Sequence, residues 1–215
     1  MTFSLKVLRD AWPALWDGLK ITMLASAAGM TVAIILALVI AIAIRGGGPT
    51  TRLTLNSLVT VVRSTPLLIQ LYLLFYVLPL YGPKLSPLTT GVIGLGLHYA
   101  SYLSEVFRAG IEAIPKGQWE AATALHLSRK TTWLRIVLPQ VAKTVLPQVG
   151  NYFISIYKSA ALLATITVVD LLGAGLNYAG ETFRYFEIFT LIGLIYFTIG
   201  FTLSRILSYL ESRFA

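Results

Sequence analysis

Long apolar runs separated by short polar gaps dominate the pattern of this chain. A helix needs about 20 apolar residues to cross a bilayer, and four uncharged runs approach or exceed that length. A fifth run, over residues 144–169, is interrupted only by Lys158. The pattern predicts an all-α integral membrane protein with five membrane-spanning helices, over residues 19–44, 56–80, 85–107, 146–172 and 186–209.

The first apolar run is too long to be the core of a cleaved signal peptide, so it predicts a helix that is retained. The segment before it, residues 1–17, mixes charged residues with apolar ones that include Trp12 and Trp16. That mixture predicts a helix lying in the membrane interface. The sequence contains no internal repeat and no flexible linker, so we expect a single domain over residues 1–215.

Composition supports the membrane assignment. Only 12% of the 215 residues are charged and 56% are hydrophobic, with a mean hydropathy of +0.76. A soluble domain carries about 25% charged residues, so an ordinary soluble enzyme and a disordered chain are both excluded. The absence of cysteine excludes thiolate chemistry and disulfides. Two histidines are too few for a multi-histidine metal site, so no metal is expected.

The net charge of +8 does not mark a nucleic-acid surface, because the basic residues lie in the gaps between apolar runs. Placing the N-terminus outside puts 10 of the 17 Lys and Arg residues in inner loops and five in outer regions. Since basic residues favour the inner side, the distribution predicts an N-out, C-in topology.

The longest inner segment, residues 108–143, is too polar to cross the membrane but contains helix-forming sequence. We expect two short amphipathic helices with a turn between them, the second limited by Pro139. A short helix is not stable alone. It must therefore pack against the rest of this protein or against a cytoplasmic partner.

The sequence Glu120-Ala121-Ala122, followed by Leu138-Pro139, resembles the EAA loop of the membrane subunits of ATP-binding cassette (ABC) importers. Further motifs resemble the polar amino acid permease branch, whose members carry His, Glu, Gln, Arg or opines. They lie at residues 63–70, 102–111, 117–118 and 139–140, and at Pro147, Asn151 and Lys158. The resemblance covers residues 18–212, nearly the whole chain.

The resemblance implies a type I importer permease with a MetI-like fold in a bacterial or archaeal cytoplasmic membrane. It also implies a second permease subunit, identical or different, two cytoplasmic ATPase subunits and a solute-binding protein outside. ATP and Mg would bind to the ATPases, and this chain would hold no cofactor and catalyse no reaction. It contains no phosphate-binding loop motif. The expected solute is a polar amino acid, and the alternative is an amino-acid-derived compatible solute such as ectoine, or an opine.

In such permeases the EAA loop seats a coupling helix in a groove of the ATPase. The residues that the resemblance assigns to this role are Gly117, Glu120, Ala121, Ala122, His126, Leu138 and Pro139. His126 stands where the family usually has glycine, which favours a tight turn. Histidine tolerates unusual backbone better than most residues, so the geometry of the loop is expected to differ only slightly. Asp170 stands where the family often has Glu, in a region where substrate specificity could be set.

Charges within the apolar runs are expensive and are expected to face the protein interior. Lys158 and Asp170 are too far apart to pair along one straight helix, and Asn151 and Ser155 share nearly the same face as Lys158. These four residues are candidates for the substrate pathway, where Lys158 would bind a carboxylate and Asp170 an ammonium group. The alternative is packing with partners from other helices.

Three more polar residues lie within or near predicted spans. Arg63 and Glu105 are expected at similar depth, where they either pair structurally or take part in gating. His98 is expected to be a hydrogen-bonded interior residue, with a proton relay as the alternative. An ion-coupled carrier and an intramembrane enzyme are distant alternatives for the whole chain, because neither an inverted repeat nor a catalytic motif is present.

Overall fold

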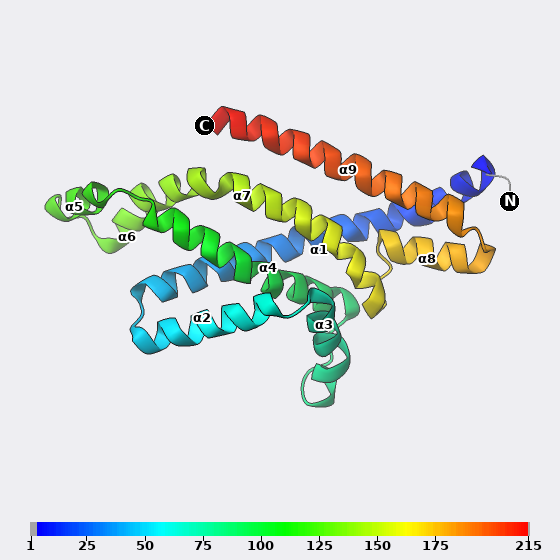
Figure 1. Ribbon diagram of the computed structural model, residues 1–215, viewed down its shortest axis with the longest axis horizontal. Coiled ribbons are helices and arrows are strands. Elements are labelled where there is room, and N and C mark those ends of the chain that lie inside the picture. Colours follow the sequence, from blue (N-terminus) through cyan, green and yellow to red (C-terminus); the bar gives the residue numbers. More distant parts are fainter. Residues whose placement is uncertain (1–3, 215) are drawn as a thin grey trace.

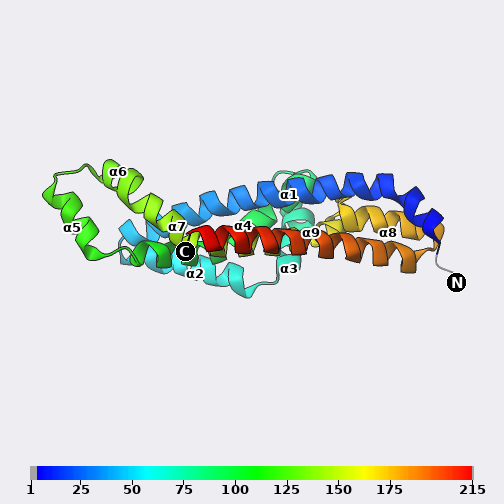
Figure 2. The same ribbon diagram turned by 90° about the horizontal axis from the view of Figure 1, so that it is seen from above.

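The computed structural model describes residues 4–214, which form an elongated all-helical structure. Helix α1 (Leu5–Gly46) and helix α9 (Tyr185–Phe214) run along its length, as do α4 (Pro87–Glu112) and α7 (Leu138–Ser159) (Figures 1 and 2). Within residues 4–214, two helices are long and apolar enough to cross a membrane, or up to four if each of two bent helix pairs counts as one span.

Helix α1 is continuous over 42 residues, which corresponds to about 63 Å at 1.5 Å per residue. An interfacial helix was expected over residues 1–17, but from Leu5 onward these residues are part of α1. Residues 1–3 lie outside the described residues. The reason is packing, since Ala11 and Leu15 are fully buried in a small core against α8 (Leu171–Thr182) and α9. The N-terminal turns are thus part of the helical bundle.

The predicted helix over residues 56–80 is wrong, because the chain bends by 103° in the middle of it. Helix α2 (Pro49–Ser64) ends before Pro66, and α3 (Leu67–Tyr72) continues as a π-helical turn, η1 (Leu73–Val77), and a 3-10 turn, η2 (Leu78–Leu80). Proline disfavours helical backbone in the residue before it, and Thr65 has extended angles (φ −103°, ψ 130°).

Helix α4 lies where the third span was expected and extends five residues further, from 107 to Glu112. Its start is capped by Ser86, whose Oγ accepts a hydrogen bond of 3.2 Å from the backbone N–H of Thr89. A Cβ on Gly96 would overlap the side chain of Val32 on α1. The missing side chain allows the two helices to pack closely, as small residues do in membrane proteins.

The fourth predicted span, residues 146–172, is wrong at both ends. A helical segment begins with α6 (Arg129–Thr131), passes through the π-helical turn η3 (Thr132–Val137) into α7, and continues as the 3-10 turn η4 (Ala160–Ile166). Pro139 does not limit this helix, because it follows a π-helical turn in which the ordinary hydrogen-bond ladder is already interrupted. The chain then breaks before α8 and bends by 47°.

The break before α8 is formed by one residue with unusual backbone. Thr167 adopts left-handed backbone (φ 66°), which is unusual for a β-branched residue. Its N–H donates to the carbonyl of Ala164, and the N–H of Val168 donates to the carbonyl of Leu163, so the two bonds close the helix end. Asp170 then starts α8 by accepting a hydrogen bond of 2.8 Å from the N–H of Gly173.

Helix α9 occupies the position of the fifth predicted span, 186–209, and extends beyond it at both ends. It contacts α7 where Leu207 lies over Gly150, and it contacts α8 where Ile192 lies over Gly175. Most of the buried core lies between α1, α4 and α7, and the smaller core joins α1, α8 and α9.

Candidate functional site

The segment between α4 and α7 projects from one end of the molecule, opposite the N-terminus (Figures 1 and 2). Helix α5 (Lys116–Ala124) ends in a tight turn at His126, which has left-handed backbone (φ 51°). The N–H of His126 donates to the carbonyl of Thr123, and the N–H of Leu127 donates to the carbonyl of Ala122, both at 3.0 Å. These two bonds form a Schellman motif, a helix end that usually has glycine at the left-handed position.

His126→Val is expected to destabilise the loop by about 1–2 kcal/mol, because a β-branched residue tolerates left-handed backbone poorly. His126→Gly should leave stability unchanged or raise it slightly. Thermal unfolding and protease susceptibility of the purified permease measure both effects. Leu125→Val is the control, since Leu125 is the neighbouring exposed residue and has an ordinary φ of −82°. Equal effects of the two valine substitutions would contradict the prediction.

The structure divides the predicted coupling residues into two groups. Gly117, Glu120, Ala121 and His126 are exposed on the projecting loop, whereas Ala122 on the opposite face of α5 is buried. Leu138 and Pro139 lie in the first turn of α7, outside the tip of the loop. The exposed face of α5 is free to contact another protein.

A contact that the sequence did not predict holds the loop against the end of α1. The rings of Trp119 on α5 and Trp133 in η3 meet edge to face, with centroids 5.7 Å apart. The guanidinium carbon of Arg45, in the last turn of α1, lies 4.6 Å from the centroid of the Trp119 ring. This cation–π arrangement joins α1 to the projecting loop. In the sequence, the only indication of this contact is the pair of tryptophans, Trp119 and Trp133, on either side of the EAA sequence.

The pathway candidates on α7 remain together, but Asp170 is separate from them. Asn151 and Lys158 are exposed in this chain, and the half-buried Ser155 donates a hydrogen bond of 3.1 Å to the carbonyl of Asn151. The Cε of Lys158 lies opposite Gly200 on α9. Asp170 is fully buried as the cap of α8, which favours the packing alternative for this residue.

His98 lies in a cluster of aromatic residues between α3, α4 and α7. Its Nδ1 is 3.3 Å from Oε1 of Gln70, and the hydroxyl of Tyr99 is 2.7 Å from Oγ of Ser159. The rings of Tyr102 and Tyr152 complete the cluster, with centroids 5.9 Å apart. His98 is thus half-buried and has a hydrogen-bond partner in this cluster.

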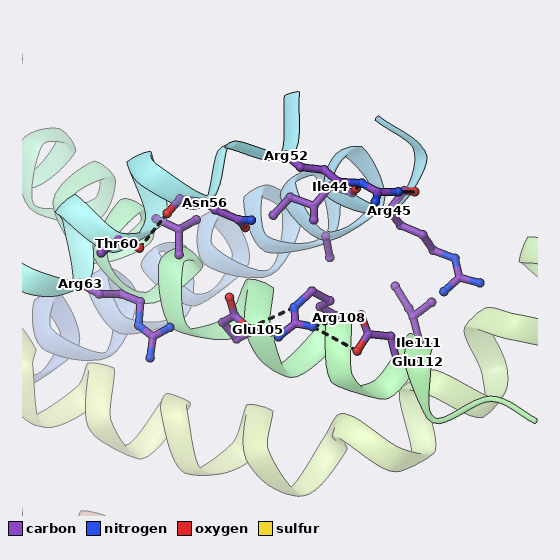
Figure 3. Close-up of a pocket in the computed structure, with 12 residues that line it drawn as sticks. Ile44, Arg45, Arg52, Asn56, Thr60, Arg63, Glu105, Arg108, Ile111 and Glu112 are labelled. Atoms are coloured by element: carbon purple, nitrogen blue, oxygen red, sulfur yellow. Dashed lines mark hydrogen bonds and ion pairs between the residues drawn. The ribbon is translucent and has the colours of Figure 1, made fainter. Parts of the chain in front are cut away.

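Arg63 and Glu105 do not form the expected pair. Glu105 binds Arg108 one turn further along α4, with Oε2 2.6 Å from Nη2, because that residue is within direct reach on the same helix. Arg63 instead lies over the ring of Tyr102, with Cζ 5.0 Å from the centroid. Both residues line one cavity between α2 and α4 (Figure 3).

The described residues form an apolar all-helical bundle with polar residues along α7 and one projecting loop, an arrangement compatible with a membrane transport subunit. Residues 29–215 match the sequence model of the family described as "Binding-protein-dependent transport system inner membrane component". The chain belongs to this family. It is a multi-pass inner-membrane permease and not an enzyme, and the resemblance found in the sequence is confirmed.

The relatives of the chain agree with this assignment over nearly its full length. It is 36% identical over 209 residues to the probable amino-acid ABC transporter permease protein y4tG of Sinorhizobium fredii, covering 96% of this chain and 87% of that protein. A crystal structure of an amino acid ABC transporter with histidines matches with a TM-score of 0.88 and 32% identity, over 99% of this chain and 100% of that one.

The MetNI methionine ABC transporter in an inward-facing conformation matches at 16% identity with a TM-score of 0.68, over 96% of this chain and 98% of that one. This more distant likeness concerns the fold alone. The structure thus has the helical permease fold shared by these transporters. Membership in a binding-protein-dependent ABC system implies an ATPase and a solute-binding protein as partners.

Proposed function

We propose that this chain forms the pathway through which a polar amino acid, delivered by a solute-binding protein, crosses the inner membrane. The observation that carries the proposal is the projecting loop, whose exposed face presents Glu120 at one end of the bundle. ATP hydrolysis on the partner subunits moves the membrane helices through this loop. The chain itself needs no cofactor, and ATP and Mg bind to the ATPases.

The proposed topology has five spans, with the N-terminus outside and the C-terminus inside. The spans are α1, the bent α2–α3 pair, α4, the segment from α6 to α8, and α9. Helix α4 has 26 residues and a length of about 39 Å, which exceeds the roughly 30 Å of a hydrocarbon core. The projecting loop and its basic residues then lie on the cytoplasmic side, in agreement with the charge distribution.

A second permease subunit, identical or different, completes the proposed pathway. Asn151 and Lys158 are exposed on α7 in this chain, at a depth where polar groups avoid lipid. A water-filled passage between two such subunits would solvate both side chains. The other exposed apolar surfaces of the bundle then contact membrane lipid.

The proposed solute class rests on the relatives, which are described as amino-acid transporters, and on the single lysine at this depth. Lys158 is placed to bind the carboxylate of an amino acid. An amino-acid-derived compatible solute such as ectoine, or an opine, is the alternative. Binding measurements on the partner solute-binding protein distinguish these classes.

The proposal is tested by reconstituting the permease with its ATPase and binding protein in liposomes. Uptake of a labelled polar amino acid should require ATP inside and the binding protein outside. Uptake by the permease alone, driven by a proton or sodium gradient, would contradict the proposal.

Lys158→Ala is expected to weaken the apparent affinity for the solute at least about tenfold in solute-stimulated ATPase assays, equivalent to about 1.4 kcal/mol. The loss follows from removing the cation that binds the carboxylate. Lys143→Ala, at an exposed position on the same helix, is the matched control and should have no effect. An unchanged apparent affinity in Lys158→Ala would remove this residue from the pathway.

A further inference from the structure

A polar cavity separates α2 from α4, along most of α2 and the last turns of α4 (Figure 3). Its volume is about 710 Å³. Helix α2 turns its polar face into the cavity and buries only Val59. Charged residues from three helices line it, namely Arg45, Arg52, Arg63, Glu105, Arg108 and Glu112.

The charge of this cavity is unbalanced. Its four arginines and two glutamates leave a net charge of +2. Both glutamates already bind Arg108, at 2.6 Å for Glu105 and 3.0 Å for Glu112. Both carboxylates of the cavity therefore form ion pairs with Arg108 of α4 and not with the other three arginines.

The remaining arginines bind neutral groups. Arg52 donates to the carbonyl oxygens of Ile44 and Arg45 at the end of α1, at 3.0 and 3.3 Å. Arg63 lies over the ring of Tyr102, which leaves the edge of its guanidinium group available for hydrogen bonds. A planar guanidinium presents paired N–H donors that fit a phosphate group. The cavity thus has the composition of a phosphate site.

The outer surface of α2 next to the cavity carries exposed apolar side chains among threonine and serine residues. Leu53 is 71% exposed, Leu58 56% and Val61 62%. A basic cavity beside such a surface suits an amphiphile, with its anionic headgroup in the cavity and its chains along the helix. Basic pockets between membrane helices on the cytoplasmic side are known to bind anionic lipid headgroups.

We propose that the cavity between α2 and α4 binds the phosphate headgroup of an anionic phospholipid from the inner leaflet, with Arg63 as the main contact. The placement on the inner side rests on the topology proposed above. The lipid fills the space between α2 and α4 and holds α2, which has little contact with the rest of the chain. Free phosphate is the other possible source of the same anionic group.

The experiment uses the purified transporter complex in mixed micelles containing phosphatidylglycerol or phosphatidylcholine, with native mass spectrometry to count retained lipids. We expect retention of phosphatidylglycerol over phosphatidylcholine. Arg63→Gln should reduce that retention about fivefold or more, while Arg63→Lys, which keeps the charge, should retain an intermediate amount. Arg205→Gln is the matched control, because Arg205 also lies over an aromatic ring, that of Phe201 on α9, but outside the cavity.

Three outcomes would overturn the lipid proposal: equal retention of the two lipids, equal losses in Arg63→Gln and Arg205→Gln, or displacement of the lipid by millimolar inorganic phosphate. The last result would assign the cavity to a free phosphate. Solute-stimulated ATPase is measured on the same samples. If solute stimulates the ATPase but the lipids are retained equally, only the lipid site is refuted. If phosphatidylglycerol is retained selectively but solute does not stimulate the ATPase, only the proposed function is refuted.

Discussion

Replacing Glu120 with lysine should abolish solute-stimulated ATPase and transport while leaving the permease folded and inserted. Glu120 is exposed on the projecting helix α5, and its carboxylate has no ion-pair partner among residues 4–214, so the substitution breaks no ion pair there. Its effect arises at the proposed contact with the ATPase, where a reversed charge meets groups arranged for a carboxylate and costs several kcal/mol. The rates of solute-stimulated ATP hydrolysis and of uptake in liposomes measure the loss.

Glu181→Lys provides the control for this experiment. Glu181 is also exposed, but it lies in α8 at the other end of the bundle. The same reversal of charge there should leave coupling to the ATPase intact. If Glu120→Lys couples normally, or if both variants fail equally, the loop is not the coupling element.

Gly18→Ala should destabilise the bundle by about 1–3 kcal/mol relative to Gly180→Ala, since that is the usual cost of an added methyl in a packed interior. A Cβ on Gly18 would lie 2.6 Å from the carbonyl oxygen of Asp170 and 2.9 Å from the Cβ of Ala174. Backbone atoms cannot rotate away, so α1 would have to separate from the start of α8. The temperature of thermal unfolding in detergent should fall by several degrees.

Gly180→Ala is the matched control for the packing effect. Gly180 also lies inside a helix, and a Cβ there would meet no atom within 4 Å. Alanine favours a helix over glycine by about 1 kcal/mol, so both substitutions carry the same gain in propensity. Equal changes in stability in the two variants would show that α1 and α8 are not in close contact near Gly18 in solution.

The apolar pattern located α4 and α9 correctly because each is an unbroken helix whose composition changes at its ends. It missed the break at Pro66 and the break at Thr167, since hydropathy measures composition and is insensitive to the direction of the chain. Pro66 was a readable signal. A left-handed threonine was not, because its conformation depends on surroundings that the local sequence does not contain.

The part of the candidate site that a sequence motif marks could be located from the sequence. The contacts between segments far apart in the chain could not. The sequence located the loop around Glu120 and identified the unusual residue at its turn, His126. It did not locate the contact of Arg45 with Trp119, because these residues are far apart in the chain. It also placed Asp170 inside a span as a possible ligand, whereas a helix break makes this residue a buried cap.

The uninterrupted length of α1 has a mechanical consequence. Its first half packs on α8 near Gly18, and its last turn touches the projecting loop through Arg45 and Trp119. Because the stretch of α1 between these two contacts is one continuous helix, a tilt of this helix would displace α8 and the projecting loop together. The loop and the far end of the bundle are thereby linked without a relay of side-chain rearrangements between them.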